Sequence, residues 1–265
     1  MPGELANVMA GRIANLFDFR GPNFTTDAAC ASGLAALSAA VEGLVDHRFD
    51  AAITGGIDHN MGVAAFVKFC KIGALSATGT RPFDAGADGF VMGEGAALFV
   101  LKRLDDAERD GDRIHAVIRA VAGSSDGKGK GITAPNPIGQ RLAVQRAWAI
   151  AGEDPASVSA IEAHGTSTRR RCDRATEPHR GVWWPGCART FDRARLGEVE
   201  HRPPEGGGEA AGLFKMVRSL HDKVLVPSLG FHDPNPNVDW DTVPFAVNTE
   251  LREWPQPRAA SGEVA

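Results

Sequence analysis

A chain of 265 residues is long enough to bury a sizeable core, either as one large domain or as two halves. Its formal net charge of −4 gives no global basic field, so nucleic acid is not an expected partner. No apolar run reaches the roughly 18 residues that a membrane span needs. The four cysteines have irregular spacing, which does not indicate a disulfide framework. We therefore expect a soluble cytoplasmic protein with no membrane contact.

Helical and strand-like patterns alternate along the chain, which predicts an α/β fold. In the helix expected from about 34 to 45, the residues expected to face a core are Leu34, Leu37, Val41, Leu44 and Val45. In the helix expected at 210–220 they are Leu213, Phe214, Val217 and Leu220. In chain order we expect a helix at 5–16, a helix from about 34 to 45, a buried strand at 51–58, a partly helical segment at 66–72, a polar loop at 81–89, strands at 97–101 and 115–121 on either side of a helix at 105–110, a loop at 123–131, a helix at 139–151, a strand at 159–163, a helix at 210–220, a loop at 227–240 and a strand at 245–254.

Cys30 lies between a short β-prone piece and the helix that begins near residue 34. The free N–H groups and the dipole at a helix N-terminus favour a thiolate over a thiol, which makes such a sulfur a nucleophile near neutral pH. The alternative is that Cys30 is a small buried apolar residue, since free cysteine is among the most buried residue types.

His164 follows the strand expected at 159–163 and lies in the turn His-Gly-Thr-Ser-Thr. A histidine in such a turn is more often structural than catalytic. An acyl-transfer site needs a nitrogen base or hydrogen-bond donor beside its nucleophile, however, and His164 is a candidate for that role.

The glycine-rich loop at 123–131 has the composition of a phosphate-binding loop. It lacks the Gly-Lys-Ser/Thr ending that would place a lysine and a hydroxyl on a nucleotide. We interpret it as a flexible loop.

Four motifs stand out in the sequence: D-A-A-C-A-S-G at 27–33, G-F-V-M-G-E-G-A at 89–96, E-A-H-G-T-S-T at 162–168 and P-N-P-N-V-D-W at 234–240. In this order and spacing they resemble the β-ketoacyl synthases, the condensing domains of fatty-acid and polyketide synthases. The resemblance covers residues 7–168 and 212–254, and residues 66–80 and 124–137 look more like multifunctional polyketide or polyunsaturated-fatty-acid synthases than a stand-alone enzyme.

The resemblance implies a thiolase-like layered αβαβα fold of two similar halves. Residues 1–110 would be the remainder of the N-terminal half, which carries the nucleophile, and residues 111–265 part of the C-terminal half. The family's N-terminal part and last strands have no match in the sequence.

The implied activity is that of an acyltransferase, a decarboxylative Claisen condensation of an acyl thioester with a malonyl carrier protein. Cys30 would accept the acyl group, and His164 would be one of two histidines that polarise the malonyl thioester. Thr166 and Thr168 match positions that hydrogen-bond the pantetheine arm. No bound cofactor or metal is implied, because the substrates are carried on the phosphopantetheine of an acyl carrier protein or as CoA thioesters.

Residues 169–208 depart from the family pattern. The family continues with V-G-D-x-x-E and later supplies a lysine and a second histidine in K-S-N-I-G-H, whereas this segment has nine arginines and no lysine. Both ends of this segment can be written in codons that, when read in one shifted frame, encode the missing family motifs. We therefore hypothesise that the segment is a frameshifted reading of an ancestral ketosynthase. A sequencing error is the rival explanation. We expect no packed strand or helix here. Cys172, His179, Cys187 and His201 lie here, but their spacing fits no compact zinc ligand pair.

Without the second histidine, its lysine and the family's C-terminal G-F-G-G-T-N-A-H segment, we expect impaired or absent condensation. Loss of one oxyanion donor alone costs about 100- to 1,000-fold in rate. Two alternatives stay open: a non-catalytic fragment that forms a homodimer or pairs with an intact ketosynthase, and another thiolase-fold acyltransferase of the thiolase or chalcone-synthase type. Uncovered sheet edges also predict aggregation.

Overall fold

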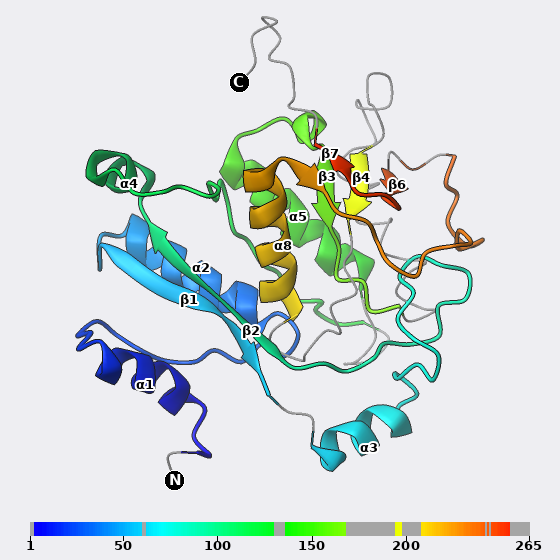
Figure 1. Ribbon diagram of the computed structural model, residues 1–265, viewed down its shortest axis with the longest axis horizontal. Coiled ribbons are helices and arrows are strands. Elements are labelled where there is room, and N and C mark those ends of the chain that lie inside the picture. The colour runs from blue at the N-terminus through cyan, green and yellow to red at the C-terminus, as the bar shows by residue number, and fades with distance from the viewer. Residues whose placement is uncertain are drawn as a thin grey trace, which may run out of the picture.

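Three small sheets and a set of helices make up the computed structural model, which describes residues 3–59, 62–129, 136–167, 194–197, 208–241, 243 and 245–254 (Figure 1). In chain order the elements are α1 (Asn7–Leu16), α2 (Ser32–Val45), β1 (Ala51–Asp58), α3 (Val63–Lys71), β2 (Gly95–Lys102), α4 (Leu104–Asp110), α5 (Pro137–Ala151), the 3₁₀ turn η1 (Pro155–Ser157), β3 (Ala160–Glu162), β4 (Ala194–Gly197), α8 (Gly208–Asp222), β5 (Val224–Leu225), β6 (Phe245–Val247) and β7 (Arg252–Glu253).

Strands β1 and β2 pair antiparallel over their whole length, from Ala51 opposite Lys102 to Asp58 opposite Gly95. Helices α2 and α8 both contact this pair and each other. Side chains alternate between the faces of a strand, so one face meets these helices and the other does not. Thr54 is accordingly buried, whereas Ile53 is 42% exposed. The expectation of a buried strand at 51–58 is therefore correct for one face only.

Strand β4 is the middle strand of the parallel sheet β3-β4-β6. It lies inside residues 169–208, for which the sequence predicts no packed element, so that prediction is wrong for this strand. The reason is that a strand flanked on both sides is held by backbone hydrogen bonds to two neighbours, and such tertiary context overrides a weak side-chain pattern. The backbone of Leu196 is in register with Ile161 and Val247.

The sequence predicts α1, α3, α4, α5 and α8 to within a few residues. α4 ends at Gly111, whose φ of 69° is the left-handed conformation that favours glycine at this position. Two strand predictions fail. Residues 115–121 form no strand, because they pair with none of the described strands, and residues 245–254 are divided into β6 and β7.

Two helices expose part of the face that the sequence assigns to the core. On α2, Leu37 and Leu44 are buried, but Leu34 and Val45 are 41% and 67% exposed. On α8, Phe214 and Leu220 are each about half exposed; the most buried positions of α8 are instead Ala210 and Ser219.

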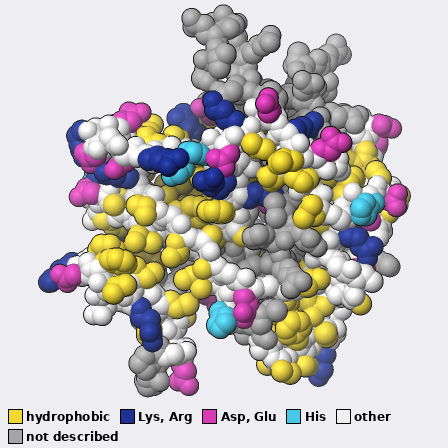
Figure 2. All heavy atoms as spheres, viewed as in Figure 1, with side chains coloured by type: hydrophobic (Ala, Val, Ile, Leu, Met, Phe, Trp, Pro, Cys, Tyr) yellow, Lys and Arg dark blue, Asp and Glu magenta, His cyan; other side chains and the backbone are white. Residues whose placement is uncertain are grey.

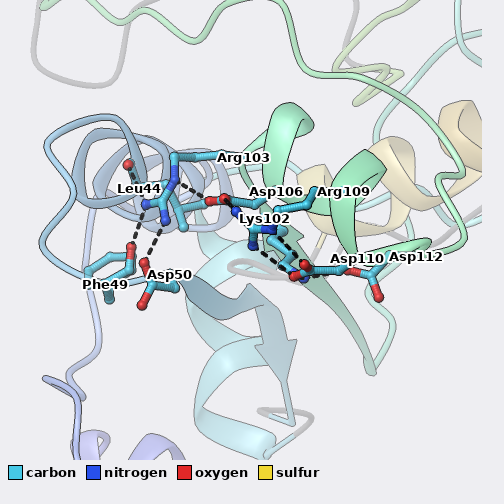
Figure 3. Close-up of polar contacts among 9 residues, drawn as sticks. All are labelled: Leu44, Phe49, Asp50, Lys102, Arg103, Asp106, Arg109, Asp110 and Asp112. Carbon is cyan, nitrogen blue, oxygen red and sulfur yellow. Dashed lines mark hydrogen bonds and ion pairs between the residues drawn. The ribbon is translucent and has the colours of Figure 1, made fainter.

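Arg103 ties the end of α2 to the start of α4 (Figure 3). Its Nη1 donates to the carbonyl oxygens of Leu44 and Phe49 at 3.0 and 2.9 Å. The same guanidinium contacts the carboxylates of Asp50 and Asp106, each at 2.5 Å. A planar fork of five N–H donors can serve these four oxygens at once, which a lysine ammonium cannot.

A hydrophobic cluster joins the loop at 81–89 to residues 238–243 and the start of β6. It consists of Phe83, Val238, Val243 and Phe245, with Trp240 packed edge-on against Phe83. None of the helices among the described residues is long and apolar enough to cross a membrane.

Candidate active site

Cys30 lies in a tight turn directly before α2 and is half-buried. The residue before it, Ala29, has a φ of 50°, a conformation that costs a non-glycine residue roughly 1–2 kcal/mol. The structure confirms that Cys30 lies next to a helix N-terminus, because α2 begins at Ser32. Strained backbone is common at functional turns, and the half-buried position of Cys30 does not fit a fully buried apolar residue.

Two polar side chains hold this turn, and the sequence analysis missed both. The Ser32 hydroxyl donates to Ala29 O at 2.6 Å and accepts from Ala28 N at 2.9 Å. The Asp27 carboxylate accepts from Ala29 N at 3.0 Å. An aspartate two residues before a tight turn and a serine at a helix start are ordinary turn-stabilising residues, so the local sequence did contain this signal.

His164 lies after β3, at the start of a turn in which Gly165 and Ser167 have φ values of 54° and 53°. Its side chain is 39% exposed, and its Nδ1 is 3.7 Å from Oε1 of Glu209 at the start of α8. Thr166 is buried. Thr168, the second position matched to pantetheine binding, lies outside the described residues.

The loop at 81–89 fixes the turn after His164. Backbone N–H groups of Arg81 and Gly89 donate to Oγ and O of Ser167, at 2.8 and 3.0 Å respectively. Ser167 is fully buried as a result. The motifs at 89–96 and 162–168, which lie far apart in the sequence, therefore meet directly.

Asp84, in the same loop, holds the two residues that come directly before the motif at 234–240. Its carboxylate accepts hydrogen bonds from the backbone N–H groups of Gly86, His232 and Asp233 at 2.7–2.8 Å. Burial would raise the pKa of Asp84, but these donors, helped by the charge of Arg81, outweigh it and hold the pKa below its usual value. The loop before Trp240 is thus attached to the loop beside His164.

Two acidic side chains lie close to His164. Glu162 is partly buried and forms an ion pair with Lys215 of α8. Burial raises the pKa of Glu162 to about 7, against the opposing effect of Lys215, and burial also raises the pKa of Glu209 to about 7. Close approach of α8 to β3 depends on Gly212, because a Cβ there would lie 3.1 Å from Cγ of Glu162.

Helix α8 connects the two halves of the candidate site. It packs against α2, which begins after Cys30, and against β3, which precedes His164. The structure thus groups His164 with Glu162, Glu209 and Lys215, and none of these three residues was predicted as a site residue. Within the described ranges, no group of three acidic, histidine or cysteine side chains could hold a metal ion. Cys172, His179, Cys187 and His201 lie outside those ranges.

Comparison with known proteins places the motifs at 27–33, 89–96 and 162–168 in one family. A family model described as "Beta-ketoacyl synthase, N-terminal domain" matches residues 1–107, and its counterpart "Beta-ketoacyl synthase, C-terminal domain" matches residues 115–174. Together the two matches cover more than half of the chain. The chain belongs to the β-ketoacyl synthase family.

Curated relatives of this ketosynthase are polyketide synthases. Polyketide synthase PksM of Bacillus subtilis is 35% identical over 94% of the chain. A phenolphthiocerol/phthiocerol polyketide synthase of Mycobacterium tuberculosis is 37% identical over 97% of it. The chain spans only 6% and 14% of these two proteins.

Solved ketosynthase structures confirm the predicted thiolase-like fold. An oxazolomycin ketosynthase domain of Streptomyces albus superposes on 98% of the chain with a TM-score of 0.91 and 33% identity. The ketosynthase from module 6 of the bacillaene synthase of Bacillus subtilis superposes on 94%, with a TM-score of 0.86 and 33% identity. The present ketosynthase chain spans 45% of each of those chains.

Proposed function

We propose that this chain acts as an acyl-accepting part of a polyketide-type ketosynthase, with Cys30 as the nucleophile. The observation that carries the proposal is the position of Cys30, in a strained turn at the N-terminus of α2, within a family whose members are condensing enzymes. An acyl carrier protein, or a CoA thioester in its place, would deliver the acyl group.

The first step is a thioester exchange. The Cys30 thiolate attacks the carbonyl carbon of the acyl thioester, the bond from that carbon to the carrier sulfur breaks, and the carrier leaves as a thiol after taking up a proton. The positive end of the α2 helix dipole, next to Cys30, favours the thiolate that attacks.

His164 would serve the second half-reaction. When a malonyl thioester loses carbon dioxide, negative charge develops on its thioester oxygen, and an imidazole N–H aimed at that oxygen stabilises it. Thr166 and Thr168 would hydrogen-bond the pantetheine arm that brings the thioester to the site.

Condensation itself should be strongly impaired in this chain. The sequence has no K-S-N-I-G-H segment to supply the family's lysine and second histidine. Groups that act as a unit fail together, so the remaining histidine cannot replace the pair. We expect acylation of Cys30 without efficient carbon–carbon bond formation.

Mass spectrometry of the intact protein tests the acylation step. After incubation with the hexanoyl thioester of N-acetylcysteamine, the wild-type protein should gain one acyl group, which peptide mapping should locate on Cys30. Cys30→Ala should gain none, while Cys70→Ala, which removes an exposed thiol on α3, should react like the wild type. Absence of an adduct on Cys30 in the folded wild type would overturn the proposal.

A malonyl carrier protein tests the second step. The acylated chain should form β-ketoacyl product at less than about a thousandth of the rate of an intact ketosynthase. A comparable rate would show that the chain needs neither the lysine nor the second histidine.

The uncovered face of the β1–β2 pair favours a second candidate, a fragment that pairs with an intact ketosynthase. Ile53, Leu98 and Val100 on this face are all at least 42% exposed. Co-expression with a tagged intact ketosynthase should then yield a complex on size-exclusion chromatography, and two separate peaks would exclude this role.

A further inference from the structure

Glu209 is the acidic side chain that faces the imidazole of His164. We propose that Glu209 is a positioning residue: its carboxylate attracts the Nδ1 side of the protonated imidazole of His164 and thereby favours the orientation and the charge of the ring that acts on the thioester. This inference rests on the proposed function of His164, but its test does not depend on acylation of Cys30.

The contact joins two elements that pack together. Glu209 lies in the first turn of α8, and α8 contacts β3, the strand that ends two residues before His164. Oε1 of Glu209 is 3.7 Å from Nδ1 of His164, which is an ion-pair separation and too long for a direct hydrogen bond. The attraction is therefore strongest when the carboxyl is ionised and the imidazole is protonated.

Among the described residues, the other charged groups of β3 and of the loop at 81–89 have partners of their own. Glu162, on β3, is paired with Lys215, so its charge is compensated. Arg81, in the loop that fixes the turn, lies near enough to Asp84 for its charge to lower the pKa of that carboxyl. Glu209 has a side-chain exposure of only 13%, and its Oε2 is buried with no hydrogen-bond partner among the described residues.

A buried carboxyl is costly to ionise, which is why burial raises the pKa of Glu209 to about 7, and His164 is the cationic partner that the described residues offer it. Protonation of His164 would supply the missing cation. The two groups therefore form a couple in which each charge stabilises the other.

The chemical consequence concerns the other ring nitrogen. With Nδ1 on the side of Glu209, Nε2 is the ring nitrogen that would act on a substrate. A neutral ring protonated on Nδ1 presents a lone pair at Nε2, whereas the protonated ring presents an N–H there. A developing enolate needs the donor, so a carboxylate that favours the protonated ring prepares His164 for that role.

A histidine titration followed by ¹⁵N NMR tests this inference on the whole chain. The His164 signal is assigned as the one that is missing in His164→Asn. In Glu209→Gln the titration midpoint of His164 should fall by about one pH unit, because the opposite charge beside Nδ1 is gone. Glu94→Gln is a matched control: Glu94 contacts Nδ1 of His59 at 3.1 Å in a largely exposed pair, and its removal should leave His164 unchanged.

An unchanged His164 midpoint in Glu209→Gln would overturn the inference if the melting temperature stays that of the wild type. If this variant does not fold, the wild-type protein gives the answer. The titration curve of the His164 signals should show a second inflection at the pH at which Glu209 ionises. The ¹³Cδ signal of the Glu209 carboxyl gives that pH independently. A single inflection would overturn the inference. Failure of Cys30 acylation would refute the proposed function without altering this titration.

Discussion

Asp84 is a buried carboxylate that joins two segments almost 150 residues apart. Its two oxygens accept three backbone hydrogen bonds, two of them from His232 and Asp233. In Asp84→Asn an NH₂ group would face backbone N–H donors and leave some of them unsatisfied. We expect the free energy of unfolding at pH 7 to fall by at least about 2 kcal/mol, as measured by urea denaturation.

The effect of Asp84→Asn should depend on pH. Because the folded-state pKa of Asp84 lies below its unfolded value, the carboxylate stabilises the fold above about pH 4, and this stabilisation is lost as the pH falls through the folded-state pKa. The difference between wild type and variant should therefore shrink in acid. Asp88→Asn is the control: its partners are the hydroxyls of Ser76 and Thr78, which can rotate, so we expect a loss below about 1 kcal/mol. Equal losses for the two variants would contradict this account of Asp84.

At the scale of elements, the β1–β2 pair depends on Gly55. Its φ of 151° is unfavourable for a residue with a side chain, and a Cβ there would lie 2.0 Å from the carbonyl oxygen of Ala97 on the partner strand. Gly55→Ala should therefore separate the two strands locally and lower the free energy of unfolding by at least about 2 kcal/mol.

Gly95 provides a matched control for Gly55 within the same pair. It lies at the first position of β2, opposite Asp58, and a Cβ there would meet nothing within 4 Å. Gly95→Ala should leave thermal unfolding nearly unchanged or slightly stabilise the protein. The account of Gly55 would be wrong if the two alanine variants melted together.

Local signals in the sequence predict local structure well. The glycine at 111 predicts the end of α4, and the switch from β-prone to helical spacing predicts that Cys30 lies beside the start of α2. Contacts between distant segments have no such signal. The pairing of Glu209 with His164 and of Asp84 with residues 232 and 233 depends on how α8 and the loop at 81–89 are placed in three dimensions. For the same reason the composition of residues 169–208 did not predict β4, because both of its neighbours lie outside that segment.

At the scale of the whole molecule, hydrophobic side chains lie uncovered over the β1–β2 pair. Figure 2 shows such side chains gathered on the part of the surface that this pair and α1 occupy. On the strands they include Ile53, Ile57, Leu98 and Val100, which are 37–76% exposed and share one face of the pair. A monomer rarely leaves a continuous apolar patch of this kind open to water. The chain on its own should therefore self-associate through this face.

Adjacent residues of β2 allow this expectation to be tested, because their side chains point to opposite faces. Val100 is 76% exposed, so Val100→Lys should keep the melting temperature of the wild type and shift the protein toward monomer in light scattering and size-exclusion chromatography. Phe99, its neighbour, lies on the face that meets the helices, so Phe99→Lys should bury a charge and unfold the protein. If Val100→Lys associates as strongly as the wild type, the uncovered strand face is not the surface that drives association, and the exposed aromatic residues that follow α1, among them Phe17 and Phe19, become the next surface to substitute.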